Sequence, residues 1–198
     1  MNQLYGLVLT GGKSERMKRD KASLELDGKK LSTRAFDLLK AHCDKVFLSV
    51  RDDQKNLEGR KGFPQILDQA PFLNIGPIGG ILSAFTQFPD VAWLVLACDL
   101  PLVTDKTIEY LISYRNKEKI AVAYKSSHDQ LPELLCAIYE PASFPLLKKH
   151  FESGQQCPRK FVINQKDVEL LTLPDAHALD NINYPEEYSK VVQWDQKK

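Results

Sequence analysis

Short apolar runs alternate along the chain with stretches in which apolar residues recur at helical spacing. Several runs are apolar at nearly every position, which is typical of strands buried on both faces of a sheet. The run over residues 91–98 is the clearest of them. The expected strands are residues 4–9, 45–50, 65–67, 91–98, 120–124, 134–139 and 168–173.

Helical periodicity fills several of the intervals between these strands. The expected helices begin near Ser32, Pro77, Thr104 and Pro185, where a capping side chain or a first-turn proline stands. Strands that alternate with helices predict an α/β fold with three layers, α/β/α, around a mostly parallel sheet. A length of 198 residues predicts one domain, residues 1–198.

Ligands of such sheets bind beyond the carboxyl ends of the strands. Gly11-Gly12, Asp68 and Asp99 each follow an expected strand directly. We therefore expect these residues to meet at one edge of the sheet.

The charge of the chain is local rather than global. Twenty-seven Lys and Arg residues nearly balance 26 Asp and Glu residues, so the net charge of +1 gives no sign of a nucleic-acid partner. Between Lys13 and Lys21, however, five cations face two carboxylates. This local excess favours a small anionic ligand.

The start of the chain and its cysteines predict a cytoplasmic protein. The first apolar run is too short for a leader or a membrane span, and glycines follow it. The four cysteines are far apart and form no Cys-x-x-Cys pair, so we expect reduced thiols, with Cys98 and Cys136 buried in strands. We expect neither a membrane partner nor a zinc site.

The glycine turn after the first strand fits a phosphate. Gly11 and Gly12 let the backbone approach a ligand, and successive N–H groups form an anion cradle. Downstream, Arg16 offers a fork for phosphate oxygens and Lys21 a point charge. The spacing matches neither a Walker A loop nor Gly-x-Gly-x-x-Gly. The same residues also fit a tight turn with a solvated basic face.

Two carboxylates and a second glycine motif are further candidates. Asp99 follows the most apolar run and suits Mg²⁺, which takes one or two carboxylates plus substrate phosphates, or it caps the turn before Thr104. Asp68 is a ligand or a plain turn residue. The glycines of Gly76-Pro77-Ile78-Gly79-Gly80 allow a base or ribose to approach, or allow tight packing at a helix entrance. The four histidines have no metal-ligand or triad spacing.

Four motifs in order give these candidates a common interpretation. They are Leu9-Thr10-Gly11-Gly12-Lys13-Ser14-Glu15-Arg16-Met17-Lys18-Arg19-Asp20-Lys21-Ala22, Gly76-Pro77-Ile78-Gly79-Gly80, Cys98-Asp99-Leu100-Pro101 and Asn181-Ile182-Asn183-Tyr184-Pro185-Glu186. With them, the chain resembles the molybdenum cofactor guanylyltransferases, within the wider nucleotidyltransferase group. The Gly-Gly pair and Asp20-Lys21 favour the guanylyl branch over the cytidylyl branch. Lys18, Thr10 and Tyr184 depart from the family pattern of Gly, Ala and Thr.

The resemblance implies a Rossmann-like nucleotidyltransferase that uses GTP, Mg²⁺ and molybdopterin. By motif, the nucleotide contacts would come from Leu9, Thr10, Gly11, Gly12, Lys21, Asp68, Gly76 and Asp99. Arg16, Lys21 and Asp99 would be catalytic, and Asp99 would hold the metal. Arg159 and Lys160 are partners for the pterin phosphate or ordinary surface cations. The resemblance also implies transient contact with proteins that make or use the molybdenum cofactor. The alternatives are a relative that uses CTP or a sugar phosphate, and a non-catalytic nucleotide-binding module.

Overall fold

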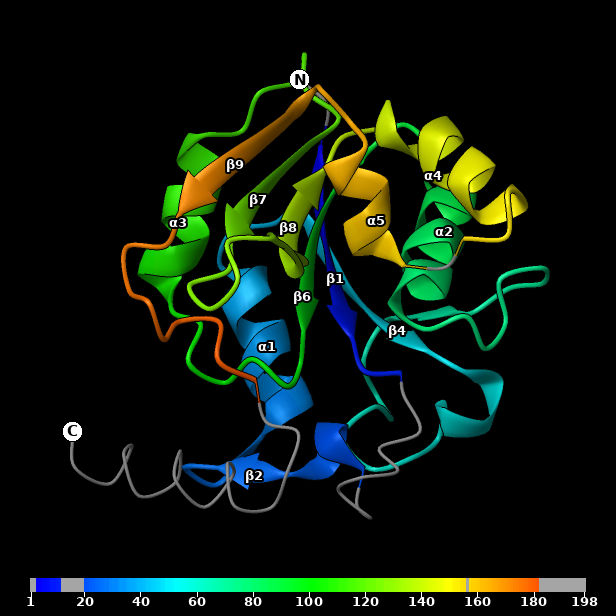
Figure 1. Cartoon of the computed structure of the whole chain (residues 1–198). Helices are drawn as coiled ribbons and strands as arrows, with labels where there is room; N and C mark the ends of the chain where they lie inside the picture. Colours follow the sequence, from blue (N-terminus) through cyan, green and yellow to red (C-terminus); the bar gives the residue numbers. More distant parts are fainter. Residues whose placement is uncertain (1–2, 12–19, 156, 182–198) are drawn as a thin grey trace.

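A computed structural model describes residues 3–11, 20–155 and 157–181 of the chain. Its centre is a seven-stranded sheet, and all seven expected strands form within it, with ends that differ by at most two residues. In spatial order the strands are β5 (Gln65–Leu67), β4 (Lys45–Val50), β1 (Leu4–Leu9), β6 (Ala92–Ala97), β8 (Pro132–Tyr139), β7 (Ala121–Lys125) and β9 (Val168–Thr172). Figure 1 shows this sheet edge-on between its helices.

The sheet is mostly parallel, as expected. Strands β5, β4, β1 and β6 run parallel to one another, and β7 is parallel to β9. Strand β8 runs antiparallel to both β6 and β7. The loop between β7 and β8 holds only residues 126–131, and so short a connection joins antiparallel strands, whereas a parallel pair needs a crossover.

Helices cover both faces of the sheet, which confirms the three layers (Figure 1). On β1, Leu7 and Leu9 belong to the core beneath α2 (Pro77–Gln87), while Val8 belongs to the core beneath α1 (Leu31–Lys40). This division follows from the alternation of side chains along a strand. Helices α4 (Ser143–Glu152) and α5 (Pro158–Ile163) lie on the α2 side, and α3 (Asp105–Ser113) lies on the α1 side.

Helix starts agree only in part with the sequence. Thr104 caps α3 through a capping box with Thr107, as expected, and α2 begins at Pro77. The assignment of Ser32 as a cap is wrong: α1 begins at Leu31, and the Ser32 hydroxyl donates instead to the carbonyl oxygen of Ala22 at 2.8 Å. The helix expected near Pro185 lies outside the described residues.

Small elements were not expected. They are the 3-10 turns η1 (Lys21–Ser23) and η2 (Asp52–Gln54) and a hairpin of β2 (Glu25–Leu26) with β3 (Lys29–Lys30). Helices α4 and α5 were not expected either.

The burial of the cysteines and the character of the helices can be compared with the sequence expectations. Cys98 and Cys136 are buried, as expected, and all four thiols are free. Burial raises the pKa of the Cys136 thiol to about 12, so this side chain behaves as an apolar core group. None of the helices in the described part of the chain has the length and apolar character needed to span a bilayer.

Replacement of Gly79 by alanine tests the packing of α2. A Cβ atom at this buried position would lie 2.4 Å from the carbonyl oxygen of Phe72. Helix propensity alone predicts that Gly79→Ala stabilises the protein, whereas this clash predicts a loss of about 1–3 kcal/mol. Urea unfolding measures the difference. Gly11→Ala is the control, because among the described residues the nearest atom to its Cβ, Oε1 of Gln54, is 4.0 Å away. A midpoint for Gly79→Ala at or above that of the parent would contradict this packing.

Candidate active site

Four neighbouring parallel strands place their carboxyl ends at one edge of the sheet. Leu9 is paired with Ser49 of β4 and with Ala97 of β6, and Val50 is paired with Leu67 of β5. The residues that follow these strands therefore share the edge. Gly11, Asp68 and Asp99 are among them, as expected, whereas Gly12 and Arg16 lie outside the described residues.

A cleft of about 280 Å³ opens at this edge. Its volume is near the lower end of small-molecule sites. Four of the residues expected at the nucleotide line it, together with residues that follow β4 or precede α2. The lining residues are Leu9, Gly11, Ser49, Arg51, Asp68, Asn74, Gly76, Pro77 and Gly80.

The glycines at the start of α2 have different roles. Gly76 has a φ of 72°, which favours glycine, and it turns the chain into Pro77 at the first helical position. The first turn of α2 thus borders the cleft, although Pro77 has no N–H and the N–H of Gly79 donates to the carbonyl oxygen of Gly76. A Cβ atom at Gly80 would lie 2.2 Å from Oγ of Ser49, so this glycine lets α2 pack against β4. For Gly80 the packing interpretation is confirmed.

Asp68 is the acidic side chain of this cleft. Its Oδ1 accepts a hydrogen bond of 3.4 Å from the Ser49 hydroxyl, and its backbone N–H donates to the carbonyl oxygen of Val50. Burial raises the pKa of the Asp68 carboxyl from 3.8 to about 6. The neighbouring Arg51 is turned to Asp53, with two hydrogen bonds of 2.8 and 2.9 Å. Asp68 therefore changes its charge near neutral pH.

Lys21 and Asp99 meet directly at the same edge. Lys21 Nζ lies 2.8 Å from Asp99 Oδ2, and the two side chains are 18% and 20% exposed. Thr104, and not Asp99, caps α3, and the Asp99 carboxylate contacts a lysine, so the role of Asp99 at a metal stays a prediction. The sequence places these residues 78 positions apart. Such a contact offers one cation and one anion, the two charges that a metal-bound phosphate would need.

Asp99 suits a metal ion that arrives with its substrate. Within the described residues, no group of three or more His, Cys, Asp and Glu side chains could hold a metal. Mg²⁺ does not need such a cage, since it commonly binds one or two carboxylates, water and substrate phosphates. A single partly exposed carboxylate fits that mode of binding. The four histidines contact protein groups, such as Asp105 in the case of His42.

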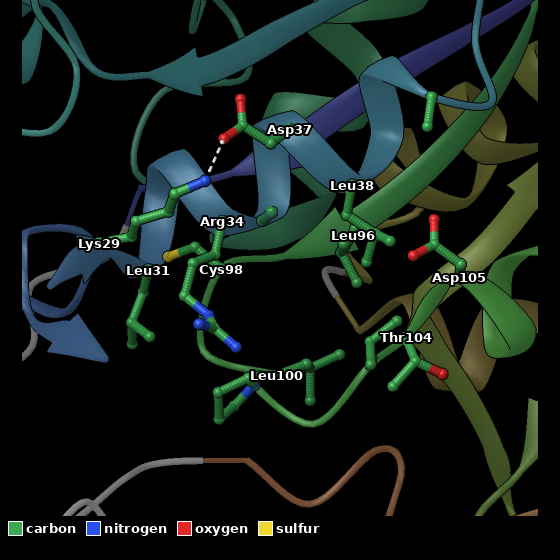
Figure 2. Close-up of a pocket in the computed structure, with 14 residues that line it drawn as sticks. Lys29, Leu31, Arg34, Asp37, Leu38, Leu96, Cys98, Leu100, Thr104 and Asp105 are labelled. Atoms are coloured by element: carbon green, nitrogen blue, oxygen red, sulfur yellow. Dashed lines mark hydrogen bonds and ion pairs between the residues drawn. The ribbon is translucent and has the colours of Figure 1, made fainter. Parts of the chain in front are cut away.

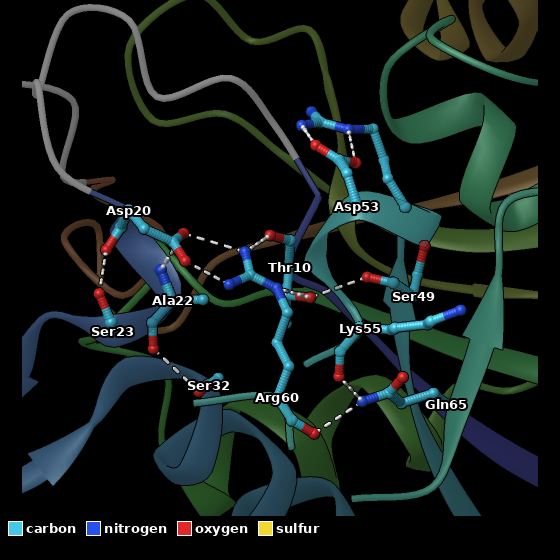
Figure 3. Close-up of polar contacts among 11 residues, drawn as sticks. Thr10, Asp20, Ala22, Ser23, Ser32, Ser49, Asp53, Lys55, Arg60 and Gln65 are labelled. Atoms are coloured by element: carbon cyan, nitrogen blue, oxygen red, sulfur yellow. Dashed lines mark hydrogen bonds and ion pairs between the residues drawn. The ribbon is translucent and has the colours of Figure 1, made fainter. Parts of the chain in front are cut away.

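Arg60 is the feature of the site that the sequence did not reveal. Its side chain is fully buried, and its guanidinium reaches both Thr10 and Asp20 (Figure 3). Nε donates to Oγ1 of Thr10 at 3.2 Å, and Nη2 donates to the Thr10 carbonyl oxygen at 2.5 Å. Nη1 and Nη2 bind the two carboxylate oxygens of Asp20. Arg60 lies in a polar stretch between β4 and β5 whose composition is typical of a surface loop. Nothing in the sequence therefore identified it as a residue of the site.

A larger hollow of about 500 Å³ lies on the α1 side of the sheet (Figure 2). Its lining combines apolar side chains, such as Leu31, Leu38 and Leu96, with charged ones, and Lys29 forms an ion pair with Asp37 there. Lys21, Asp68 and Asp99 do not line it. Of these three residues, Asp68 lines the smaller cleft, whereas Lys21 and Asp99 line neither hollow.

Arg159 is held by carboxylates. Its guanidinium lies 2.9 Å from both Asp129 and Glu133, whereas Lys160 is exposed. Burial raises the pKa of the Glu133 carboxyl above its usual value. A phosphate at Arg159 would compete with two acidic side chains, so its role in pterin binding stays a prediction.

Comparisons with known proteins give these features a family. A model of the MobA-like NTP transferase domain matches residues 6–168. A "Molybdenum cofactor biosynthesis bifunctional protein" from Synechocystis is 36% identical over 188 residues, 95% of this chain and 53% of that protein, so the chain spans about half its length. A molybdenum cofactor guanylyltransferase from Campylobacter jejuni is 24% identical over 190 residues, 96% of each chain.

A solved structure has the same fold. Molybdopterin-guanine dinucleotide biosynthesis protein A from Archaeoglobus fulgidus superimposes with a TM-score of 0.81 at 23% identity, over 98% of this chain and all of that one. The resemblance drawn from the four sequence motifs is thus confirmed. Because the family model covers residues 6–168 of the 198, the chain belongs to the family of MobA-like NTP transferase domains.

Proposed function

We propose that this protein transfers GMP from GTP to molybdopterin and releases pyrophosphate. The names of its relatives support the reaction. The observation that carries the proposal is the 2.8 Å contact of Lys21 with Asp99 at the sheet edge where a cleft of about 280 Å³ opens. That edge combines a pocket for a nucleoside with charges suited to phosphates.

The reaction needs little from the protein beyond placement and charge. A phosphate oxygen of molybdopterin attacks the α-phosphorus of GTP, the bond from that phosphorus to the bridging oxygen breaks, and pyrophosphate leaves. A phosphate nucleophile is already ionised at neutral pH, so no general base is required. The enzyme must hold the two anions in line and offset the negative charge that grows on the leaving group.

The residues of the cleft divide this task. The base and ribose would occupy the cleft beside Asp68 and Gly76, where a carboxylate and the first turn of α2 offer hydrogen-bond partners. The triphosphate would extend along the Thr10-Gly11 turn toward Lys21, whose ammonium would neutralise phosphate oxygens. Gly12 and Arg16 are proposed to add contacts on the same side, as their motif implies.

Asp99 would hold Mg²⁺ in this arrangement. When bound, Mg²⁺ would neutralise phosphate charge and make the α-phosphorus more electrophilic. The Lys21 ammonium lies 2.8 Å from the Asp99 carboxylate and holds that side chain in place. The free thiols of the chain suit a reducing compartment, so we also propose a cytoplasmic enzyme that meets other proteins of cofactor synthesis or use transiently.

The choice of nucleotide tests the proposal directly. With molybdopterin as acceptor, we expect pyrophosphate release with GTP, and release at least about tenfold slower with CTP, ATP or UTP, the factor that corresponds to about 1.4 kcal/mol. Mass spectrometry of the product should show the guanine dinucleotide. A preference for CTP, or turnover only with a sugar phosphate, would contradict the proposal, and GTP binding without turnover on any acceptor would indicate a binding module.

Loss of the Asp99 carboxylate should slow the chemical step. For Asp99→Asn we expect a fall of about 10²–10³ in the rate of GTP-dependent pyrophosphate release, since charge stabilisation of this kind has that magnitude in other enzymes. Asp90→Asn, an exposed carboxylate just before β6, is the matched control and should match the parent. A rate for Asp99→Asn within tenfold of the parent would refute the metal role.

The raised pKa of Asp68 predicts a pH dependence of GTP binding. If the carboxylate accepts hydrogen bonds from the nucleoside, KM for GTP should rise as the pH falls through about 6, where Asp68 takes up a proton. Asp68→Asn should bind more weakly and lack this step. The phosphates of GTP titrate equally in both assays, so the ratio of the two KM profiles isolates Asp68. A flat ratio between pH 5 and 8 would dismiss this contact.

A further inference from the structure

We infer that Arg60 is a positioning residue, which ties the end of β1 to η1 and thereby places Lys21 for the triphosphate. The inference rests on the proposed function, because it assigns Lys21 to phosphates. Arg60 itself is fully buried and does not reach a ligand. Its effect must pass through Thr10 and Asp20.

One guanidinium binds both flanks of the glycine-rich segment. Thr10 follows β1 directly and Asp20 precedes η1, ten positions later. Arg60 donates to Oγ1 and the carbonyl oxygen of Thr10 and to both carboxylate oxygens of Asp20 (Figure 3). The planar fork of arginine makes these four hydrogen bonds from three nitrogen atoms, whereas lysine has only three donors on one nitrogen and cannot reproduce them. The contacts fix the distance between the two ends of the segment.

From Asp20 the constraint passes to Lys21. Asp20 Oδ1 also accepts a hydrogen bond of 3.2 Å from the N–H of Ala22, and this bond caps η1. The Asp20 carbonyl oxygen accepts a hydrogen bond of 2.9 Å from the Ser23 hydroxyl. Lys21 is the first residue of this turn, and its Nζ lies 2.8 Å from Asp99. The side chain that would meet the phosphates therefore stands on backbone that Arg60 holds.

The turn that carries Arg60 packs against η1. Gly59 has a φ of 80°, and a Cβ atom there would lie 2.9 Å from the carbonyl oxygen of Ala22 and 2.9 Å from Oγ of Ser32. The carbonyl oxygen of Arg60 accepts a hydrogen bond of 2.8 Å from Nε2 of Gln65 on β5. This close packing sets where the guanidinium starts. Arg60 is thus anchored at both its backbone and its fork.

The position of Arg60 predicts a division between the two ends of the nucleotide. The guanidinium contacts Thr10 and Asp20, which belong to the phosphate side. It does not line the cleft of Asp68 and Gly76, where the base and ribose would bind. Loss of the fork should therefore weaken the handling of the triphosphate and spare the binding of a nucleoside.

Arg60→Lys is the decisive variant, because it keeps the positive charge and removes the fork. We expect kcat/KM for GTP to fall by about 10²-fold, since a displacement of about 1 Å has that effect on a positioned group. Calorimetry should show weaker GTP binding, while the Kd of guanosine stays within twofold of the parent. A general loss of stability, in contrast, would weaken the binding of both GTP and guanosine.

A matched control separates placement from stability. Arg115 forms another buried ion pair, with Glu140, which is 1% exposed, and it lies outside the site. We expect Arg115→Lys and Arg60→Lys both to lower the melting temperature, and we expect Arg115→Lys to leave GTP and guanosine binding unchanged. Arg60→Lys with kcat/KM for GTP within threefold of the parent would overturn the inference.

Two further measurements keep the inference testable. If Arg60→Lys does not fold, Asp20→Asn weakens the same contact from its partly exposed partner, and a parental kcat/KM for Asp20→Asn would overturn the inference. The parent enzyme tests the proposed function separately. If it binds GTP but does not turn over with molybdopterin, the proposed function fails, and the comparison of GTP with guanosine binding still decides the role of Arg60.

Discussion

The parallel alignment of four neighbouring strands is the constraint on which the site depends. Because β5, β4, β1 and β6 run in one direction, every loop that follows them leaves from the same edge. Residues that are far apart in the sequence, such as Gly11 and Asp99, thereby become neighbours of one cleft or of its rim. The backbone arrangement gathers the polar groups, and the apolar strand interiors hold that arrangement in place.

The charged residues at this edge form two ion pairs, one in the interior and one nearer the surface. Arg60 is buried and binds Asp20, and the next residue, Lys21, reaches the partly exposed Asp99. A buried cation is costly unless it is paired and hydrogen-bonded, and both conditions hold for Arg60. Under the proposed function, the outer pair would exchange its contacts for a ligand, while the inner pair would keep the turn in shape. This order suits an enzyme that must bind and release highly charged molecules.

Much of the fold could be predicted because it rests on local pattern. Continuous apolar runs identified the strands, and their ends identified the edge where Asp68 and Asp99 lie. The hairpin of β2 and β3 was missed, although Asp27-Gly28, with φ values of 50° and 69°, is a typical two-residue turn and its sequence was a usable signal. Ser32 was misassigned because its hydroxyl bonds to Ala22, in a neighbouring element.

The tertiary contacts of the site could not be derived from pattern alone. The pairing of Lys21 with Asp99 spans 78 positions, and that of Arg60 with Asp20 spans 40. The periodicity of apolar residues carries no information about contacts between residues so far apart in the sequence. The motifs suggested Lys21 and Asp99 through a family resemblance, whereas Arg60 stands in a polar loop and belongs to none of the quoted motifs. Arg60 is buried in the fold because the loop that carries it packs against η1.

The most direct test of the account is a crystal structure of the protein with GTP and Mg²⁺. The account predicts the guanine and ribose in the cleft beside Asp68 and Gly76, the triphosphate at Lys21, and the metal on Asp99. A nucleotide bound in the larger hollow beside α1, or a metal that lies away from Asp99, would contradict it.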